Sequence, residues 1–275
     1  MDRETFESFL QFFRYDAELP LDVESRGTGR EQGLTWETVA FRSTAGQRVV
    51  ADLYRAGGEW RDRPSLILLH GGSGAGRAAP TTRYMAGLFS RAGFNVLAID
   101  MLHFGDRDTG LLETYSEGEK HERLYNRHAT YLEWVTQTVK DVRRSVDLLV
   151  QQFGVEPGRV GLAGFSRGAV VATIVAAADT RLAATVMVNG GHFDRRETGH
   201  SAAACPANYI GRIAPRPLLM VNGRHDGDML LETSVAPLFA LAGEPKRMIL
   251  MDTGHQRPTP EAQAEIIAWL HDAIP

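Results

Sequence analysis

Residues 164–168 read Gly164-Phe165-Ser166-Arg167-Gly168 and stand between two apolar segments. Residues 159–163 are typical of a short buried strand, and residues 169–178, rich in Ala and Val, are long enough for a buried helix. The glycines permit a turn so tight that the serine takes a strained backbone conformation. Such a turn exposes the Ser166 hydroxyl at the carboxyl end of the strand and points the Arg167 backbone N–H at the space before it. Ser166 is therefore a candidate nucleophile.

An aspartate and a histidine follow the ends of later predicted strands. Apolar runs at residues 184–189, 217–223 and 247–251 predict three more strands, and Asp226 and His255 come after the last two. Residues just past the carboxyl ends of parallel strands converge at one edge of the sheet. His255 would accept the proton of Ser166, and Asp226 would fix the tautomer of the histidine. Asp228, two residues further on, remains the alternative acid.

A glycine-rich loop follows an earlier predicted strand at residues 64–69, and it reads His70-Gly71-Gly72-Ser73-Gly74-Ala75-Gly76. We predict that the backbone N–H of Gly72, together with that of Gly71, joins the Arg167 N–H in an oxyanion hole, because glycine lets the backbone approach a substrate closely. His70 is predicted to pack this loop rather than to transfer protons.

The same loop does not match the two common phosphate-binding patterns. Gly71 and Gly76 have the glycine spacing of a Walker A loop, but Arg77 and Ala78 stand where lysine and a hydroxyl residue are needed. The glycines also lack the G-x-G-x-x-G spacing of a dinucleotide loop. Nucleotide binding is therefore disfavoured.

Taken together, these motifs resemble the α/β-hydrolase superfamily and, more narrowly, its dienelactone hydrolase and acetyl xylan esterase branch. The resemblance covers residues 64–275 and implies a mostly parallel eight-stranded sheet flanked by helices, serine-hydrolase chemistry and no cofactor. Dienelactone hydrolases use a cysteine nucleophile, whereas this chain has Ser166. The resemblance therefore implies ordinary ester hydrolysis. We expect carboxylic esters of small to medium acyl groups to be cleaved through an acyl-enzyme.

Composition narrows the class of protein further. The chain has 275 residues and a net charge of −4, which suits one α/β domain over residues 1–275 and disfavours nucleic-acid binding. The single cysteine, Cys205, cannot form an internal disulfide and is expected to be incidental. The charged start of the chain does not fit a signal peptide, and no run of about 18 apolar residues predicts a membrane span. We expect a cytoplasmic enzyme without membrane partners.

Periodicity predicts the remaining layout. Residues 3–15 favour an amphipathic helix, which we expect to pack on the domain's own core, with a lid or homodimer contact as the alternatives. The rest of residues 1–33 is expected to be a loop. Residues 34–43 and 48–55 predict an antiparallel hairpin around Ala45-Gly46. A long helix is expected over residues 132–153, and a last helix begins at Thr259-Pro260.

Two connections, residues 101–128 and 190–215, are longer than a simple strand-to-helix link and are predicted to cover Ser166 as lid or specificity segments. They supply the candidate substrate-binding residues His103, Phe104, Tyr125, His192 and Phe193. The competing interpretation is solvated loop charge, in which Glu113, Glu117, Glu119 and Glu122 pair the nearby bases. Their histidines form no H-E-x-x-H pattern or close His/Asp cluster, so no metal is expected.

Two further functions remain open. One is an amidase or peptidase of the acylaminoacyl-peptidase type, although such enzymes usually carry a β-propeller that does not fit in this length. The other is a non-catalytic ligand receptor, although such receptors usually lack a triad residue. A small-molecule ester is the expected substrate.

Overall fold

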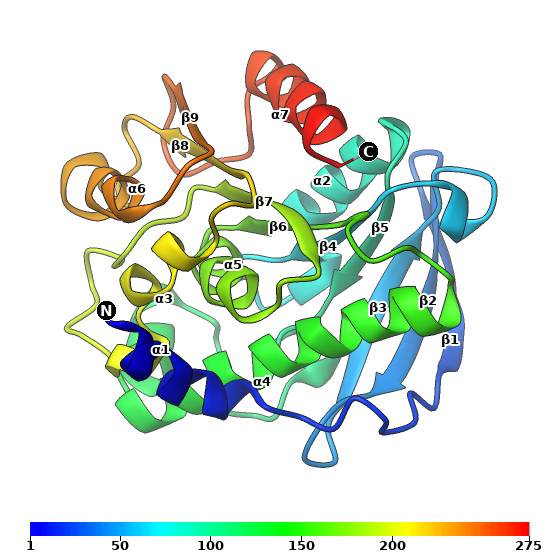
Figure 1. Ribbon diagram of the computed structural model, residues 1–275, viewed down its shortest axis with the longest axis horizontal. Helices are drawn as coiled ribbons and strands as arrows, with labels where there is room; N and C mark the ends of the chain where they lie inside the picture. Colours follow the sequence, from blue (N-terminus) through cyan, green and yellow to red (C-terminus); the bar gives the residue numbers. More distant parts are fainter. Residues whose placement is uncertain (275) are drawn as a thin grey trace.

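One mixed sheet runs through the molecule, which the computed structural model describes over residues 1–274, so that Pro275 lies outside the described residues. The strands lie in the order β1-β2-β3-β5-β4-β6-β7-β8-β9 (Figure 1). Their bounds are β1 (Glu24–Glu31), β2 (Leu34–Arg42), β3 (Arg48–Tyr54), β4 (Ser65–Leu69), β5 (Asn95–Ile99), β6 (Val160–Phe165), β7 (Leu182–Val188), β8 (Leu218–Gly223) and β9 (Lys246–Met251). Pairs from β1 to β5 are antiparallel, and those from β5 through β4 to β9 are parallel.

The sheet has one strand more than the eight expected. The extra strand, β1, lies in the segment that was expected to be a loop, and it pairs with β2 from Glu24 opposite Ala40 to Glu31 opposite Leu34. Nearly all of its residues are exposed. A strand without a buried face needs no alternation of apolar and polar residues, so its sequence carries no hydrophobic signal. The predicted hairpin is confirmed as the antiparallel pair β2 and β3.

Helices cover both faces of the sheet. Their bounds are α1 (Arg3–Leu10), α2 (Pro80–Arg91), α3 (Glu117–Lys120), α4 (His128–Asp147), α5 (Arg167–Ala178), α6 (Ala236–Leu241) and α7 (Pro260–Ala273). One core lies between the sheet and α2 and α7, and the other lies between the sheet and α4 and α5 (Figure 1). Strands β4 and β5 are buried along their whole length for this reason, which explains why every residue after the first of each, Ser65 and Asn95, is apolar.

The predicted long helix and last helix are confirmed. Helix α4 ends at Asp147 and continues into a π-helical turn over Leu148–Gln152. Helix α7 begins at Pro260, and its N-cap residue Thr259 accepts a hydrogen bond from the Ala262 backbone N–H. No helix within residues 1–274 has the length and apolar character that crossing a membrane requires.

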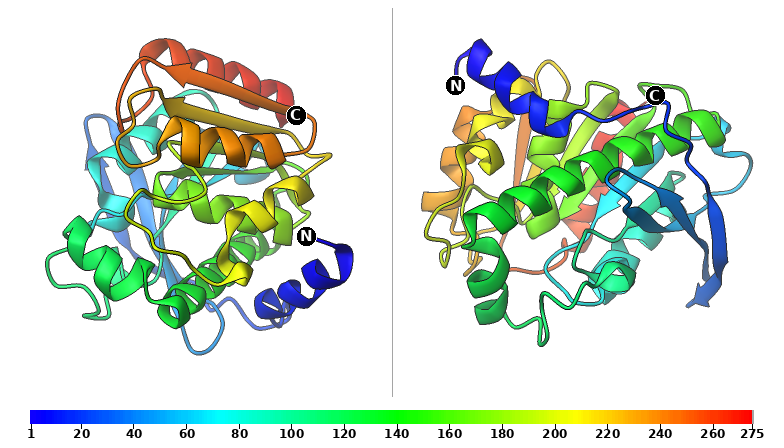
Figure 2. Two further views of the ribbon diagram at one scale, coloured as in Figure 1. Left: turned by 90° about the vertical axis from the view of Figure 1, so that its left-hand side faces the viewer. Right: turned by 90° about the horizontal axis from the view of Figure 1, so that it is seen from below.

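The N-terminal helix packs on the segment of residues 190–215. Phe6, Phe9 and Phe13 surround the ring of Tyr209, with centroid separations of 6.0, 6.5 and 5.9 Å. Figure 2 shows α1, in blue, beside this yellow segment in both views. The apolar face of the helix thus packs against the rest of its own domain, as the sequence predicts.

Candidate active site

The turn between β6 and α5 holds Ser166 in a conformation that side chains rarely adopt. Its φ is 54° and its ψ is −120°. A Cβ on Gly164 would lie 2.5 Å from the Gly168 carbonyl oxygen, and a Cβ on Gly168 would lie 2.4 Å from the His70 carbonyl oxygen. Both contacts are with backbone, which cannot give way as a flexible side chain can. The two glycines are therefore needed for the backbones of β4, β6 and α5 to approach so closely.

The structure brings Ser166 and His255 together although 89 residues separate them in the chain. Ser166 follows β6, and His255 follows β9 at the same edge of the sheet. The Nε2 atom of His255 lies 2.8 Å from Ser166 Oγ, and its Nδ1 atom lies 2.7 Å from Asp226 Oδ2. The imidazole thus bridges a hydroxyl and a carboxylate, which is the geometry of a serine nucleophile with its base and orienting acid.

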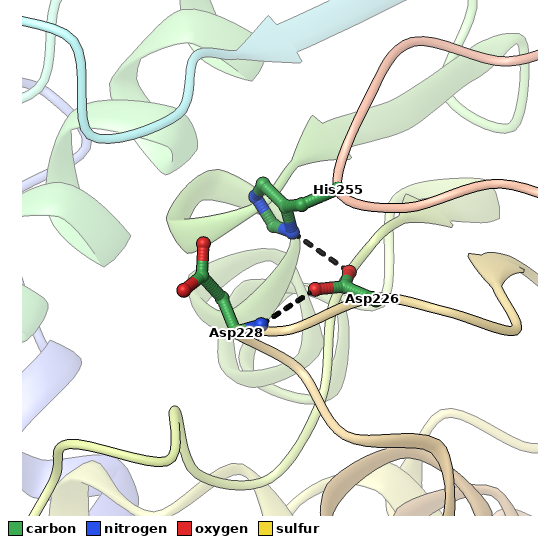
Figure 3. Close-up of side chains that lie close together, drawn as sticks. All are labelled: Asp226, Asp228 and His255. Carbon is green, nitrogen blue, oxygen red and sulfur yellow. Dashed lines mark hydrogen bonds and ion pairs between the residues drawn. The ribbon is translucent and has the colours of Figure 1, made fainter.

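Asp226, rather than Asp228, faces the imidazole. Asp226 is buried after β8, and its second oxygen, Oδ1, accepts hydrogen bonds of 2.9 Å from the backbone N–H groups of Asp228 and Met229. The Asp228 side chain is 31% exposed and makes no hydrogen bond to the imidazole among the described residues. Figure 3 shows the Asp226 carboxylate between the His255 ring and the Asp228 backbone. Three donors therefore hold Asp226 in one orientation.

The electrostatic surroundings of His255 favour its charged form. Burial opposes the charge, but the hydrogen bond and negative charge of Asp226, assisted by Asp228 and Asp194, outweigh burial and raise the pKa of His255 above its ordinary 6.5. The imidazolium that would form when Ser166 loses its proton is thereby stabilised.

The same residues form a His/Asp cluster that sequence spacing does not reveal. Suitable atoms of Asp226, Asp228 and His255 all lie within 4.8 Å of one another (Figure 3). However, both Asp226 oxygens and both His255 nitrogens already have hydrogen-bond partners within the protein. The chemistry of this donor set therefore fits a proton relay better than a metal site.

The loop after β4 lies directly against Ser166. A Cβ on Gly71 would meet Ser166 Cβ at 3.3 Å. Within residues 1–274, the backbone N–H groups of Gly71, Gly72 and Arg167 donate to no protein atom. The buried His70 ring shapes this loop, because its Nδ1 donates to the Gly71 carbonyl at 2.6 Å and its Nε2 accepts from the Met101 N–H at 3.0 Å. His70 thus has the packing role that the sequence suggests.

A cavity of about 350 Å³ opens in front of Ser166. Five of its side chains carry formal charges, and Tyr125 alone among the five predicted substrate-binding residues lines it. The lining residues within the described chain are Gly72, Ser73, Gly74, Tyr115, Glu117, Lys120, Tyr125, Phe165, Ser166, Arg167, Asp194, Asp228, Met229 and His255.

The structure does not bring the other four predicted substrate-binding residues to this cavity. Phe104 is completely buried and packs against His70 and Trp134, because burial of an apolar ring in the segment after β5 is favourable. His103 bonds instead with the Thr109 hydroxyl, through its Nδ1 at 2.6 Å. His192 and Phe193 pack edge to face, with 4.1 Å between their ring centroids and 61° between their planes, so the two rings contact each other rather than the cavity.

Sequence reasoning missed two of the five charged residues in the cavity, Lys120 and Asp194, and it did not place the charges of Glu117 and Arg167 there. The Nζ of Lys120, a residue only 3% exposed, donates to the Gly72 carbonyl oxygen at 2.7 Å and pairs with Glu117. The Arg167 guanidinium forms a buried ion pair with Glu197. The sequence does carry a signal for the short helix that holds Lys120. Ser116 and Glu119 have the spacing of a capping box, and Ser116 does cap α3. The glutamates of this segment therefore have two different environments. Glu113 pairs with Arg123 at the surface, whereas Glu117 lines the cavity.

Comparison with known proteins supports the fold. A model of the family described as "Alpha/beta hydrolase family" matches residues 66–272. No curated protein matches the sequence. Among solved structures, an acetyl xylan esterase from Paenibacillus has a TM-score of 0.72 at 16% identity, over 98% of this chain and 92% of that one. Acetyl xylan esterase 1 from Thermoanaerobacterium has a TM-score of 0.71 at 18% identity, over 99% and 93%. An esterase from Pyrococcus furiosus has a TM-score of 0.68 at 18% identity, over 90% and 97%.

Proposed function

The chain belongs to the alpha/beta hydrolase family, and from that premise we propose that it is a serine esterase that cleaves carboxylic esters of small to medium acyl groups. The observation that carries the proposal is the hydrogen-bonded chain from Asp226 through His255 to Ser166, with links of 2.7 and 2.8 Å. A serine hydroxyl is a weak nucleophile until a neighbouring base can take its proton. Here His255 would be that base, and Asp226 would be the acid that orients it.

In the proposed reaction, Ser166 Oγ attacks the ester carbonyl carbon while His255 Nε2 accepts the hydroxyl proton. The tetrahedral intermediate carries its negative charge on the former carbonyl oxygen, which the backbone N–H groups of Gly72 and Arg167 stabilise. Arg167 is the first residue of α5, so the positive end of that helix dipole also favours the charge.

The intermediate collapses when the bond to the alcohol oxygen breaks and His255 gives its proton to that oxygen. The acyl group is then held on Ser166 as an ester. His255 next removes a proton from water, which attacks the acyl carbon. The second intermediate collapses when the bond from the acyl carbon to Ser166 Oγ breaks and His255 returns its proton to that oxygen, which releases the acid and restores Ser166. Asp226 keeps Nδ1 protonated throughout, so that Nε2 alone exchanges protons.

The acyl group is expected to be short. The cavity, about 350 Å³, has charged side chains from Glu117, Lys120 and Asp194 in its lining, and a long alkyl chain gains little by displacing water from such groups. Phe165 and Met229 offer the apolar contact that a small acyl group needs.

The test is release of p-nitrophenol from acyl esters of two to twelve carbons by the wild-type protein and by Ser166→Ala. We expect turnover that is greatest for short acyl groups and absent in the variant, with an unchanged circular dichroism spectrum. Equal release by the variant, or release from peptide p-nitroanilides without release from esters, would contradict the proposal.

A further inference from the structure

One polar group in the active-site cavity has no partner. Within residues 1–274, the Tyr125 hydroxyl is the only side-chain N or O atom of the cavity lining that is buried without a hydrogen bond. Tyr125 is 2% exposed, so little water replaces the missing partner. A buried hydroxyl left unpaired costs about 1 to 3 kcal/mol, and such groups call for a specific explanation.

The hydroxyl lies beside the loop that carries the proposed oxyanion donors. A Cβ built on Gly72 would lie 3.1 Å from Tyr125 Oη, a tight contact that shows how close the hydroxyl is to this residue. The same point lies 3.0 Å from Lys120 Nζ, but that ammonium group is already committed to the Gly72 carbonyl oxygen and to Glu117. The phenol is therefore the uncommitted donor next to the Gly72 amide.

The ring of Tyr125 is held rigidly. The Arg167 guanidinium lies 3.9 Å over its face, and the rings of His121, Tyr131 and Trp134 surround it with centroid separations of 5.2, 6.3 and 6.1 Å. Tyr125 also ends the π-helical turn His121–Tyr125, a kind of turn that is frequent at functional sites. Preorganisation of this kind lets a donor act without reorganising during the reaction.

The hydroxyl keeps its proton at neutral pH. Burial raises the pKa of Tyr125 above its ordinary 10, whereas the charge of Arg167 acts in the opposite direction. The group is thus a neutral donor beside a cation, and a neighbouring positive charge strengthens donation to an anion.

We propose that the Tyr125 hydroxyl is a third hydrogen-bond donor to the oxyanion, beside the amides of Gly72 and Arg167. The inference rests on the proposed function, because an oxyanion forms only if Ser166 attacks a carbonyl. The hydroxyl is unpaired in the free enzyme and gains its partner as negative charge develops on the substrate oxygen. It therefore stabilises the transition state more than the bound substrate.

The test is Tyr125→Phe, which keeps the ring and removes the hydroxyl, measured on p-nitrophenyl acetate. We expect kcat to fall about 10- to 100-fold while KM changes less than twofold, since the contact is made in the transition state. Thermal stability should be unchanged or higher, because a buried unpaired hydroxyl is removed. A trifluoromethyl ketone, which forms a tetrahedral oxyanion on the serine, should bind the variant more weakly by a similar factor.

Tyr131→Phe is the matched control, because its hydroxyl is buried in the same aromatic cluster but does not line the cavity. Its kcat should stay within twofold of wild type. An undiminished kcat in Tyr125→Phe, a change confined to KM, or an equal loss in Tyr131→Phe would overturn the inference alone. Absence of Ser166-dependent turnover in the wild-type protein would overturn the proposed function, and the inference with it.

Discussion

Substituting Asn for Asp226 is expected to trap His255 in the wrong tautomer. The Oδ1 atom of Asp226 accepts from the backbone N–H groups of Asp228 and Met229, both at 2.9 Å, and Oδ2 faces His255 Nδ1. An asparagine has only one oxygen, and the two backbone donors require it. The amide NH₂ must then face Nδ1, which becomes an acceptor, and the proton moves to Nε2. A protonated Nε2 cannot take the proton of Ser166.

The size of the effect follows from the hydrogen bonds involved. Turning the asparagine oxygen back to His255 would forfeit two backbone hydrogen bonds, at about 0.5 to 1.5 kcal/mol each. Loss of the carboxylate also removes a charge-assisted hydrogen bond to the imidazolium, which contributes about 1.5 to 3 kcal/mol. The total is about 2.5 to 6 kcal/mol, which corresponds to a loss of about 10²- to 10⁴-fold in kcat.

The assay is steady-state hydrolysis of p-nitrophenyl acetate by Asp226→Asn and by the neighbouring Asp228→Asn, with thermal unfolding measured for both. We expect Asp228→Asn to lose less than about tenfold, because this partly exposed side chain acts on His255 only through its charge. A larger loss in Asp228→Asn than in Asp226→Asn would refute the reasoning and make Asp228 the orienting acid.

Two further predictions concern His255 and the serine turn. Because its surroundings raise the pKa of His255 and only the neutral imidazole can accept a proton, the acid limb of kcat/KM should have its midpoint above pH 6.5. The midpoint should move to lower pH in Asp228→Asn, and no shift or an upward one would contradict this. Gly168→Ala should lower the free energy of unfolding in urea by about 2 kcal/mol or more, because its Cβ would lie 2.4 Å from the His70 carbonyl oxygen. Gly118→Ala in α3, where a Cβ meets nothing within 4 Å, should change it by less than about 1 kcal/mol, and equal effects would contradict the argument.

Much of the fold could be predicted from local patterns. The fully buried strands β4 and β5 are apolar at all but their first residue. Thr259 and Pro260 indicate where α7 begins. These signals are strong because the period of a strand or helix and its capping chemistry depend on neighbours in the chain. Strand β1 escaped prediction, since an exposed edge strand is held by backbone pairing with β2 that no pattern of side chains records.

The sequence by itself determined the strained turn at Ser166 and the order in which Ser, Asp and His follow their strands. That order is enough to predict that the three residues lie close together, because residues that follow the carboxyl ends of parallel strands lie at the same edge of the sheet. Only the tertiary structure decided between Asp226 and Asp228, since both follow β8 and differ in which carboxylate reaches the imidazole. It alone also put Lys120 in the cavity and Phe104 in the core, and it separated Tyr125 from the other predicted substrate-binding residues. The direction of a side chain in a long loop is set by packing against distant elements, and that packing has no local sequence signature.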